Sequence, residues 1–182
     1  MIYEKENLLL HSCCAPCSPY VMKLLSEKYN ISIFFYNPNI HPKEEYELRV
    51  NEIKKLCAET GTDLILGDYD TDLWFQSVKG LENEPEKGKR CEICFRLRLK
   101  SCMQKAEELK IPYVTTTLTV SPLKNASTIN FIGNNLALEY GIHFLAENFK
   151  KQNGFKLTCE LAKEYNFYRQ NYCGCIFSQR IK

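Results

Sequence analysis

The strongest constraint on the fold is an alternation of short apolar runs with longer segments that have helical spacing. The run at 8–12 (LLLHS) predicts a buried strand, and 18–29 follows it with apolar residues at helical intervals. The pattern repeats and predicts strands at 8–12, 31–37, 62–68, 111–119 and 142–149, and helices at 18–29, 41–61, 72–78, 91–110, 121–141 and 157–170. Such alternation indicates right-handed crossovers between parallel strands. We therefore expect a single α/β domain over residues 1–182, with an open, mainly parallel sheet and flanking helices.

Polar and sulfur side chains follow several of these strands at the point where each strand ends. In sheets of this kind, ligands bind beyond the carboxyl ends of the strands, where the strand order reverses. The residues expected at this edge are Cys13, Cys14 and Cys17 after the first strand, Asn37 and Asn39 after the second, Asp68 and Asp70 after the third, and Thr115 to Thr117 with Ser121 at the fourth. The sequence thus predicts a site at this edge.

The chain has ten cysteines among 182 residues. No signal peptide or membrane span is visible in the sequence, so we expect a cytoplasmic protein that does not engage a membrane. Thiols stay reduced in that compartment, and ten cysteines there indicate metal ligands or redox catalysts more than a disulfide scaffold.

Two CxxC pairs make a metal site the favoured interpretation. Cys14 and Cys17 form one pair, and Cys91 and Cys94 form the other. Four thiolates suit either tetrahedral zinc or an iron–sulfur cluster, and the spacing does not choose between them. A structural zinc would take its four ligands from the two CxxC pairs and leave Cys13 without a role. The third thiol of the first group therefore favours a reactive, iron-containing site. Both groups are expected at helix N-termini, where the helix dipole favours thiolate.

A third cysteine group, Cys173-Gly174-Cys175, is too closely spaced for a relaxed disulfide. Gly174 lets the backbone bend enough to close a strained bridge, which would be easily reduced. This favours a redox couple, although one or both thiols could instead bind metal.

The remaining cysteines and the histidines are weaker candidates for a site. Cys57, Cys102 and Cys159 lie in helical stretches and are expected to be small buried hydrophobic residues. His11 and His143 are expected to be packed or hydrogen-bonded, whereas His41 lies in a loop at the predicted edge.

Six blocks along the chain resemble the QueH-type epoxyqueuosine reductases. The blocks are HSCCAPC, YNPNIHP, RCEICFRLRL, TTTLTVSP, KQNGF and YRQNYCGC, and they run from residue 11 to about residue 178. The resemblance implies a Rossmann-like fold similar to the nucleotide-binding sheets of tRNA-modifying ATPases. Those enzymes carry a glycine-rich phosphate loop after the first strand, but this chain has SCCAPCS there, without glycine. We expect a metal site in place of the nucleotide site.

The resemblance also implies an activity and its cofactor. The activity is the last step of queuosine synthesis, removal of the epoxide oxygen from epoxyqueuosine at the wobble position of tRNA, by a cobalamin-independent oxidoreductase with a [4Fe–4S] cluster. By resemblance, Cys13, Cys14, Cys91 and Cys94 match cluster ligands, although spacing alone would select Cys14 and Cys17.

Further roles follow from the same resemblance. Cys173 and Cys175 match a redox-active pair in a C-terminal helix and tail (150–182) of the same domain. Cys17 then remains for catalysis or for a second iron ion, together with Asp68 or Asp70. The electron donor is not identified by the sequence.

The C-terminal stretch suggests where tRNA binds. Residues 142–182 carry seven Lys and Arg residues against three acidic ones, with eight Phe and Tyr residues. The candidates for phosphate contacts are Lys150, Lys151, Lys156, Arg169 and Arg180. Two other functions stay open: an ATP-dependent iron–sulfur tRNA-modifying enzyme, such as a thiolase, and a zinc-bound RNA-binding module.

Overall fold

The computed structural model describes residues 4–179. Its sheet has five strands in the order β3-β2-β1-β4-β5, and every neighbouring pair is parallel. The strands are β1 (Glu6–His11), β2 (Tyr29–Phe35), β3 (Asp63–Leu66), β4 (Tyr113–Thr116) and β5 (His143–Phe144). The predicted α/β class and parallel sheet are therefore confirmed. Because β2 and β4 flank β1 on opposite sides, the strand order reverses between β1 and β4.

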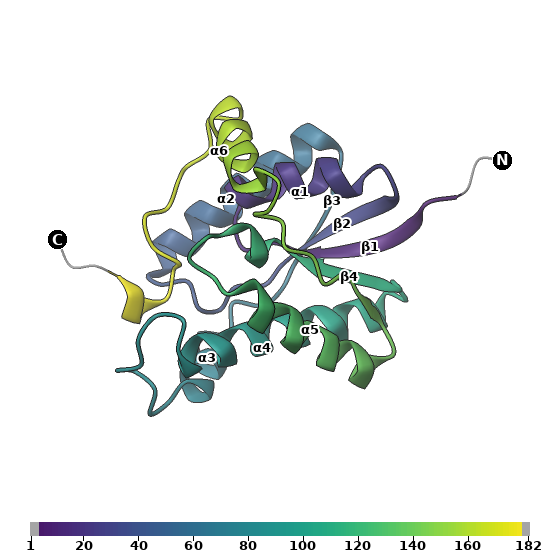
Figure 1. The fold of residues 1–182 in the computed structure, drawn as a ribbon. Helices are drawn as coiled ribbons and strands as arrows, with labels where there is room; N and C mark the ends of the chain where they lie inside the picture. The colour runs from purple at the N-terminus through teal and green to yellow at the C-terminus, as the bar shows by residue number, and fades with distance from the viewer. Residues whose placement is uncertain (1–3, 180–182) are drawn as a thin grey trace.

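Helices cover both faces of the sheet (Figure 1). On one face lie α1 (Ser18–Leu25), α2 (Lys43–Thr60) and α6 (Gly154–Glu164), and on the other lie α3 (Thr71–Ser77), α4 (Lys89–Glu108) and α5 (Ala126–Tyr140). Side chains along β1 point alternately to the two faces of the sheet. Leu8 and Leu10 therefore pack with the first set of helices, and Leu9 packs with the second set. Three short 3₁₀ helices, η1 (Ala15–Cys17), η2 (Thr117–Val120) and η3 (Ile176–Ser178), complete the fold.

Several predicted boundaries were wrong for local reasons. The first helix ends at Leu25 and not at residue 29, because Tyr29 already pairs with Glu6 in the sheet. The fifth strand is only two residues long, and just beyond it the Thr115 hydroxyl donates to the carbonyl of Leu145.

The last helix occupies Gly154–Glu164, whereas 157–170 was predicted. Asn153 and Asn166 bracket it with left-handed φ angles of 63° and 50°, which an α-helix cannot include. The chain beyond α6 is thus irregular and free to cross the carboxyl edge of the sheet.

Candidate metal and redox site

The first thiol group follows β1 directly. The Sγ atoms of Cys13, Cys14 and Cys17 all lie within 4.8 Å of one another. Cys14 is extended and begins η1, where Pro16 occupies the first turn. Because the chain turns back immediately after the strand, three thiols from five residues face one small volume.

A hydroxyl network fixes this turn. Ser12 and Ser18 share a hydrogen bond of 2.7 Å between their Oγ atoms, and Ser18 also donates to the carbonyl of Cys14 at 3.0 Å. Both serines are fully buried. The turn therefore keeps its backbone polar groups satisfied although it lies inside the protein.

Across the switch point, the first residue of η2 holds Cys13. The Thr117 hydroxyl accepts a hydrogen bond from the Cys13 backbone N–H at 3.1 Å and donates to Cys13 Sγ at 3.3 Å. The end of β4 thereby orients a thiol carried by the end of β1.

The second thiol pair lies at the start of α4. Cys91 is in the first turn, where its Sγ accepts a hydrogen bond from the Lys87 backbone N–H at 3.3 Å, and Cys94 is one turn further and buried. The predicted helix N-terminal position is correct for Cys91. Their Sγ atoms do not join the tight group formed by Cys13, Cys14 and Cys17.

The third pair, Cys173 and Cys175, lies in the C-terminal segment, which hydrogen bonds hold against α2 and the loop before it. Arg49 donates to the carbonyls of Tyr172 and Cys173, both at 3.2 Å, and the His41 backbone N–H donates to the Gly174 carbonyl at 2.8 Å. Gly174 has a φ of 102°, and a Cβ there would lie 2.8 Å from Ile40, so only glycine fits between the two cysteines.

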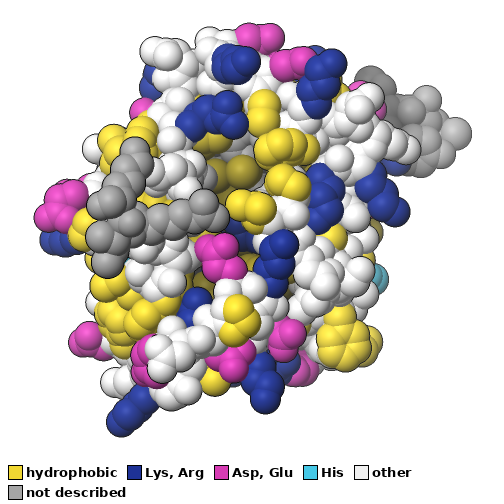
Figure 2. All heavy atoms as spheres, turned by 60° about the vertical axis from the view of Figure 1, so that its left-hand side comes forward, with side chains coloured by type: hydrophobic (Ala, Val, Ile, Leu, Met, Phe, Trp, Pro, Cys, Tyr) yellow, Lys and Arg dark blue, Asp and Glu magenta, His cyan; other side chains and the backbone are white. Residues whose placement is uncertain are grey.

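One cavity of about 290 Å³ joins the three groups. Its wall includes seven cysteines, which come from the β1 turn, from α4, from α6 and from the C-terminal segment: Cys13, Cys17, Cys91, Cys94, Cys159, Cys173 and Cys175. Cys14 is fully buried and does not line the cavity. Figure 2 shows a hollowed face of the molecule, with hydrophobic side chains inside the recess and Lys and Arg side chains around it. The predicted carboxyl edge is thus where the thiols meet.

Within each close group, one thiol is favoured as thiolate. Hydrogen bonds from Cys14 and Cys17 hold the pKa of Cys13 well below its usual value, and the same contact raises the pKa of Cys14 to about 12. In the C-terminal pair, the hydrogen bond from Cys175 lowers the pKa of Cys173, while the pKa of Cys175 is raised. A thiolate is the form that binds metal and attacks electrophiles.

The chemistry of this donor set fits an iron–sulfur cluster. Thiolate sulfur is the ligand of such clusters. Four thiols of the β1 turn and α4 line the cavity, and the Sγ atom of Cys14 lies within 4.8 Å of those of Cys13 and Cys17. Three buried donors in the wall, Trp74 Nε1, Arg90 Nε and Arg98 Nε, have no hydrogen-bond partner among the described residues. Unpaired donors beside thiols suit a negatively charged, sulfur-rich group.

The predicted carboxylates lie elsewhere. Asp68 and Asp70 are exposed, and neither lines the cavity. Asp70 begins α3, where its side chain accepts a hydrogen bond from the Leu73 N–H at 2.9 Å. This arrangement gives no support to a second metal ion shared by Cys17 and these residues, and their role stays a prediction.

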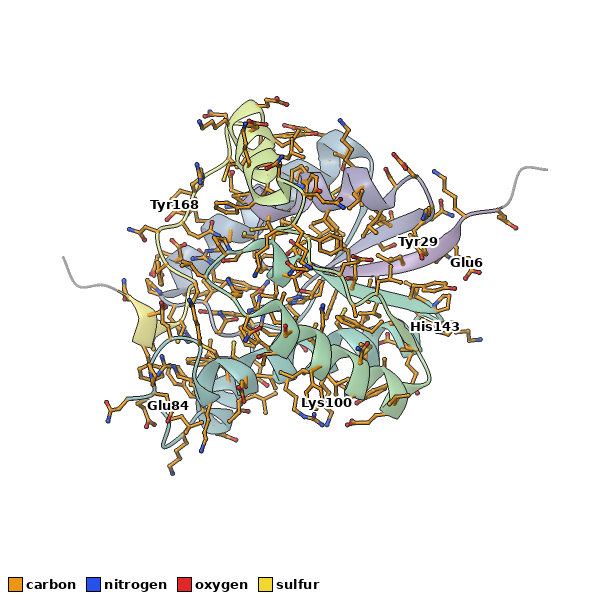
Figure 3. The ribbon with its side chains drawn as sticks, viewed as in Figure 1. Glu6, Tyr29, Glu84, Lys100, His143 and Tyr168 are labelled. Atoms are coloured by element: carbon orange, nitrogen blue, oxygen red, sulfur yellow. The ribbon has the colours of Figure 1, made fainter. Side chains whose placement is uncertain are left out.

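The histidines take three different positions. His11 is buried between Thr116 and the Tyr36 carbonyl, and burial lowers its pKa to about 3, so it is neutral. His143 is exposed and stacks on Tyr113 at the end of the molecule opposite Glu84 and Tyr168 (Figure 3). His41 is buried near Trp74 and Phe75 and does not line the cavity.

Of the basic candidates that the structure describes, only Arg169 lines the cavity. The Lys150 ammonium donates hydrogen bonds to the carbonyls of Ser121 and Lys124, in the loop before α5. Lys151 and Lys156 are exposed on the surface, and Arg180 lies outside the described residues. Two further lysines, Lys87 and Lys124, line the cavity and were not predicted.

Sequence reasoning also missed residues that support the thiols. Arg98 is buried and follows Cys91 and Cys94 at spacings of seven and four, so helical periodicity could have indicated it. Cys159, predicted to be an inert buried residue, is half-buried in the cavity wall, where Arg169 donates to its Sγ at 3.5 Å. Cys57 and Cys102 are buried in the two cores as predicted.

Among the described residues, no helix is both long enough and apolar enough to cross a membrane.

Comparison with known proteins agrees with this geometry. A family model described as "Epoxyqueuosine reductase QueH" matches residues 8–181. A protein named epoxyqueuosine reductase QueH from Streptococcus pyogenes is 40% identical over 191 residues, covering 100% of this chain and 75% of its own length. Another of that name from Acinetobacter baylyi is 45% identical, covering 96% of this chain and 81% of its own.

A solved structure shares the fold. The U34-tRNA thiolase NcsA from Methanococcus maripaludis, determined with its [4Fe–4S] cluster, superposes with a TM-score of 0.61 at 14% identity. The match covers 97% of this chain but only 63% of the thiolase. Because the identity is low, the match bears on the fold alone. Taken with the full-length sequence matches, the cysteine-lined cavity identifies the chain as a member of the epoxyqueuosine reductase QueH family.

Proposed function

We propose that this protein reduces epoxyqueuosine in tRNA to queuosine. The observation that carries the proposal is a single cavity at the strand switch point, lined by cysteines from four separate segments. Removal of an epoxide oxygen needs two electrons and two protons, and it leaves an alkene and water. Thiols and a thiolate-bound metal cluster are suited to this chemistry, and membership of the family supports the choice of substrate.

The proposed cofactor is a [4Fe–4S] cluster, with Cys13, Cys14, Cys91 and Cys94 as its ligands. Cys13 and Cys14 have their Sγ atoms 3.7 Å apart, and Cys94 is buried beside the same cavity. A bound cluster supplies single electrons to its surroundings. Cys17, half-buried in the wall, then remains for contact with the substrate or for a second iron ion.

Cys173 and Cys175 are proposed to act as a dithiol. When the two thiols join in a disulfide, they release two electrons and two protons, which equals the requirement of the epoxide. The unequal pKa values of the two thiols support this role, because a thiolate beside a protonated thiol provides both a nucleophile and a proton. An external reductant must then return two electrons, with two protons from solvent, to reopen the bridge, and dithionite can serve in the test.

The proposed partner is tRNA carrying epoxyqueuosine. Lys87, Lys124 and Arg169 line the same cavity as the cysteines, so phosphates flanking the modified base would meet positive charge there. All ten cysteines are free thiols, which suits a reducing cytoplasm where tRNA is also found.

The test is anaerobic reconstitution with iron and sulfide, followed by incubation with dithionite and tRNA that contains epoxyqueuosine. Nucleosides are then released and analysed by mass spectrometry. We expect conversion to queuosine without ATP. No conversion by protein that holds a full cluster would contradict the proposed activity, and a requirement for ATP would point to the thiolase-like alternative.

A further inference from the structure

Arg98 lies on the helix that carries two of the proposed cluster ligands. It follows Cys94 by four residues on α4, so the two side chains share one face of the helix. The residue is only 3% exposed and lines the cavity. Its positive charge is therefore held out of solvent and beside the thiols.

The guanidinium of Arg98 lacks an acidic partner. The ion pairs within 4 Å among residues 4–179 do not include it. Its Nη2 donates to Asn37 Oδ1, and its Nε has no partner among the described residues. Arg49, equally buried, is neutralised by Glu45 at 2.7 Å. A buried charge without a partner destabilises a protein. The burial of Arg98 without an acidic partner therefore indicates that a negative group binds inside the cavity.

Two of the proposed cluster ligands, Cys13 and Cys94, line the same cavity wall as Arg98. The acidic residues of the cavity wall, Glu86 and Glu92, are exposed and form no ion pair with Arg98.

Asn37 holds the guanidinium in place. It is fully buried, and its Nδ2 donates to the carbonyl of Ser12 at 3.0 Å while its Oδ1 accepts from Arg98. The charge is thus fixed between the end of β1, which carries the first thiols, and α4, which carries the second pair.

We propose that Arg98 is the counter-charge of the iron–sulfur cluster and a positioning residue that raises its reduction potential. The inference rests on the cofactor proposed above. Reduction adds negative charge to the cluster, and a fixed positive charge in a low-dielectric site stabilises the reduced form more than the oxidised one. Arg98 thereby makes the cluster easier to reduce.

The experiment compares reconstituted wild-type protein with Arg98→Gln, Arg98→Lys and the control Arg96→Gln. Arg96 is on the same helix but half-exposed and paired with Glu139, so its loss changes net charge equally without touching the cavity. Midpoint potentials are measured by redox titration followed by electron paramagnetic resonance. We expect a more negative potential for Arg98→Gln, a value close to wild type for Arg98→Lys, and no change for the control.

The outcomes separate the inference from the cofactor proposal. Wild-type protein that takes up no iron and sulfide would overturn both. A loaded Arg98→Gln variant with wild-type potential, or equal shifts for Gln and Lys, would overturn the inference alone. An unchanged potential with weakened tRNA affinity would instead assign Arg98 to a substrate phosphate. If Arg98→Gln fails to hold the cluster, loading by Arg98→Lys supports the counter-charge, and failure of both variants overturns it.

Discussion

The hydroxyl of Thr117 makes two hydrogen bonds to Cys13, accepting from its backbone N–H at 3.1 Å and donating to its Sγ at 3.3 Å. The two residues are 104 positions apart in the chain and belong to the ends of neighbouring parallel strands. This contact joins the two halves of the sheet at the switch point, and it fixes the orientation of a thiol proposed as a cluster ligand.

Replacing Thr117 by Val should therefore destabilise the apo-protein. The change keeps the side-chain volume but leaves the buried Cys13 N–H without an acceptor, at a cost of about 1–3 kcal/mol. Urea denaturation measures the loss, and Thr117→Ser, which keeps the hydroxyl, is the matched control. Equal stability of the Val variant and wild type would show that the N–H finds another partner.

The CxxC pair on α4 gives a prediction about metal content. Cys91→Ala and Cys94→Ala should each lose most of the iron and sulfide after reconstitution, because each removes a proposed ligand. Cys159→Ala is the control, since Cys159 lines the same cavity from α6 and is not a proposed ligand. Iron and sulfide analysis with absorbance spectroscopy decides the matter, and full clusters in both variants would refute the ligand assignment.

The sequence predicted the sheet and the meeting of thiols at its edge because both depend on periodicity and strand direction. Cys13 and Cys91 line one cavity because β1 and α4 pack on one another. The cavity wall beyond α6 was not predictable in this way. Arg169 and Cys159 come together only because Asn166 adopts a left-handed conformation and ends α6 early.

Asp70 shows why strand order alone does not define a role. Its position after β3 indicated the carboxyl edge, but an Asp that precedes a short helix can also cap that helix, and this is what its side chain does. A part for Asp70 in a second metal site stays a prediction.

Phosphate binding should depend on the charges in the cavity wall. Arg169→Glu should weaken tRNA binding and reduce the slope of log affinity against log salt by about 0.7, the value for one contact with a single strand. Lys100→Glu is the control, because Lys100 is exposed on α4 and does not line the cavity (Figure 3). Binding is measured by fluorescence anisotropy over a salt series. Equal losses in the two variants would mean that only net charge matters.

The C-terminal cysteine pair gives the most direct chemical prediction. Cys173→Ser and Cys175→Ser should each keep the iron–sulfur content but lose turnover, because neither variant can close a disulfide. Cys159→Ser is the matched control in the same cavity and should turn over. The segment should stay in place in both variants, since Arg49 and His41 hold it through backbone carbonyls that the substitutions do not alter.

Mass spectrometry can observe the pair itself. Fully reduced wild-type protein, given one equivalent of substrate tRNA and no added reductant, should form one disulfide between Cys173 and Cys175 as one epoxide is lost. The electrons balance, because the dithiol gives up the two that the epoxide takes. Wild-type turnover by both serine variants would eliminate the dithiol mechanism. Loss of iron from either variant would make that residue a ligand, and Cys14, which does not line the cavity, would be the first of the proposed ligands to be reassigned.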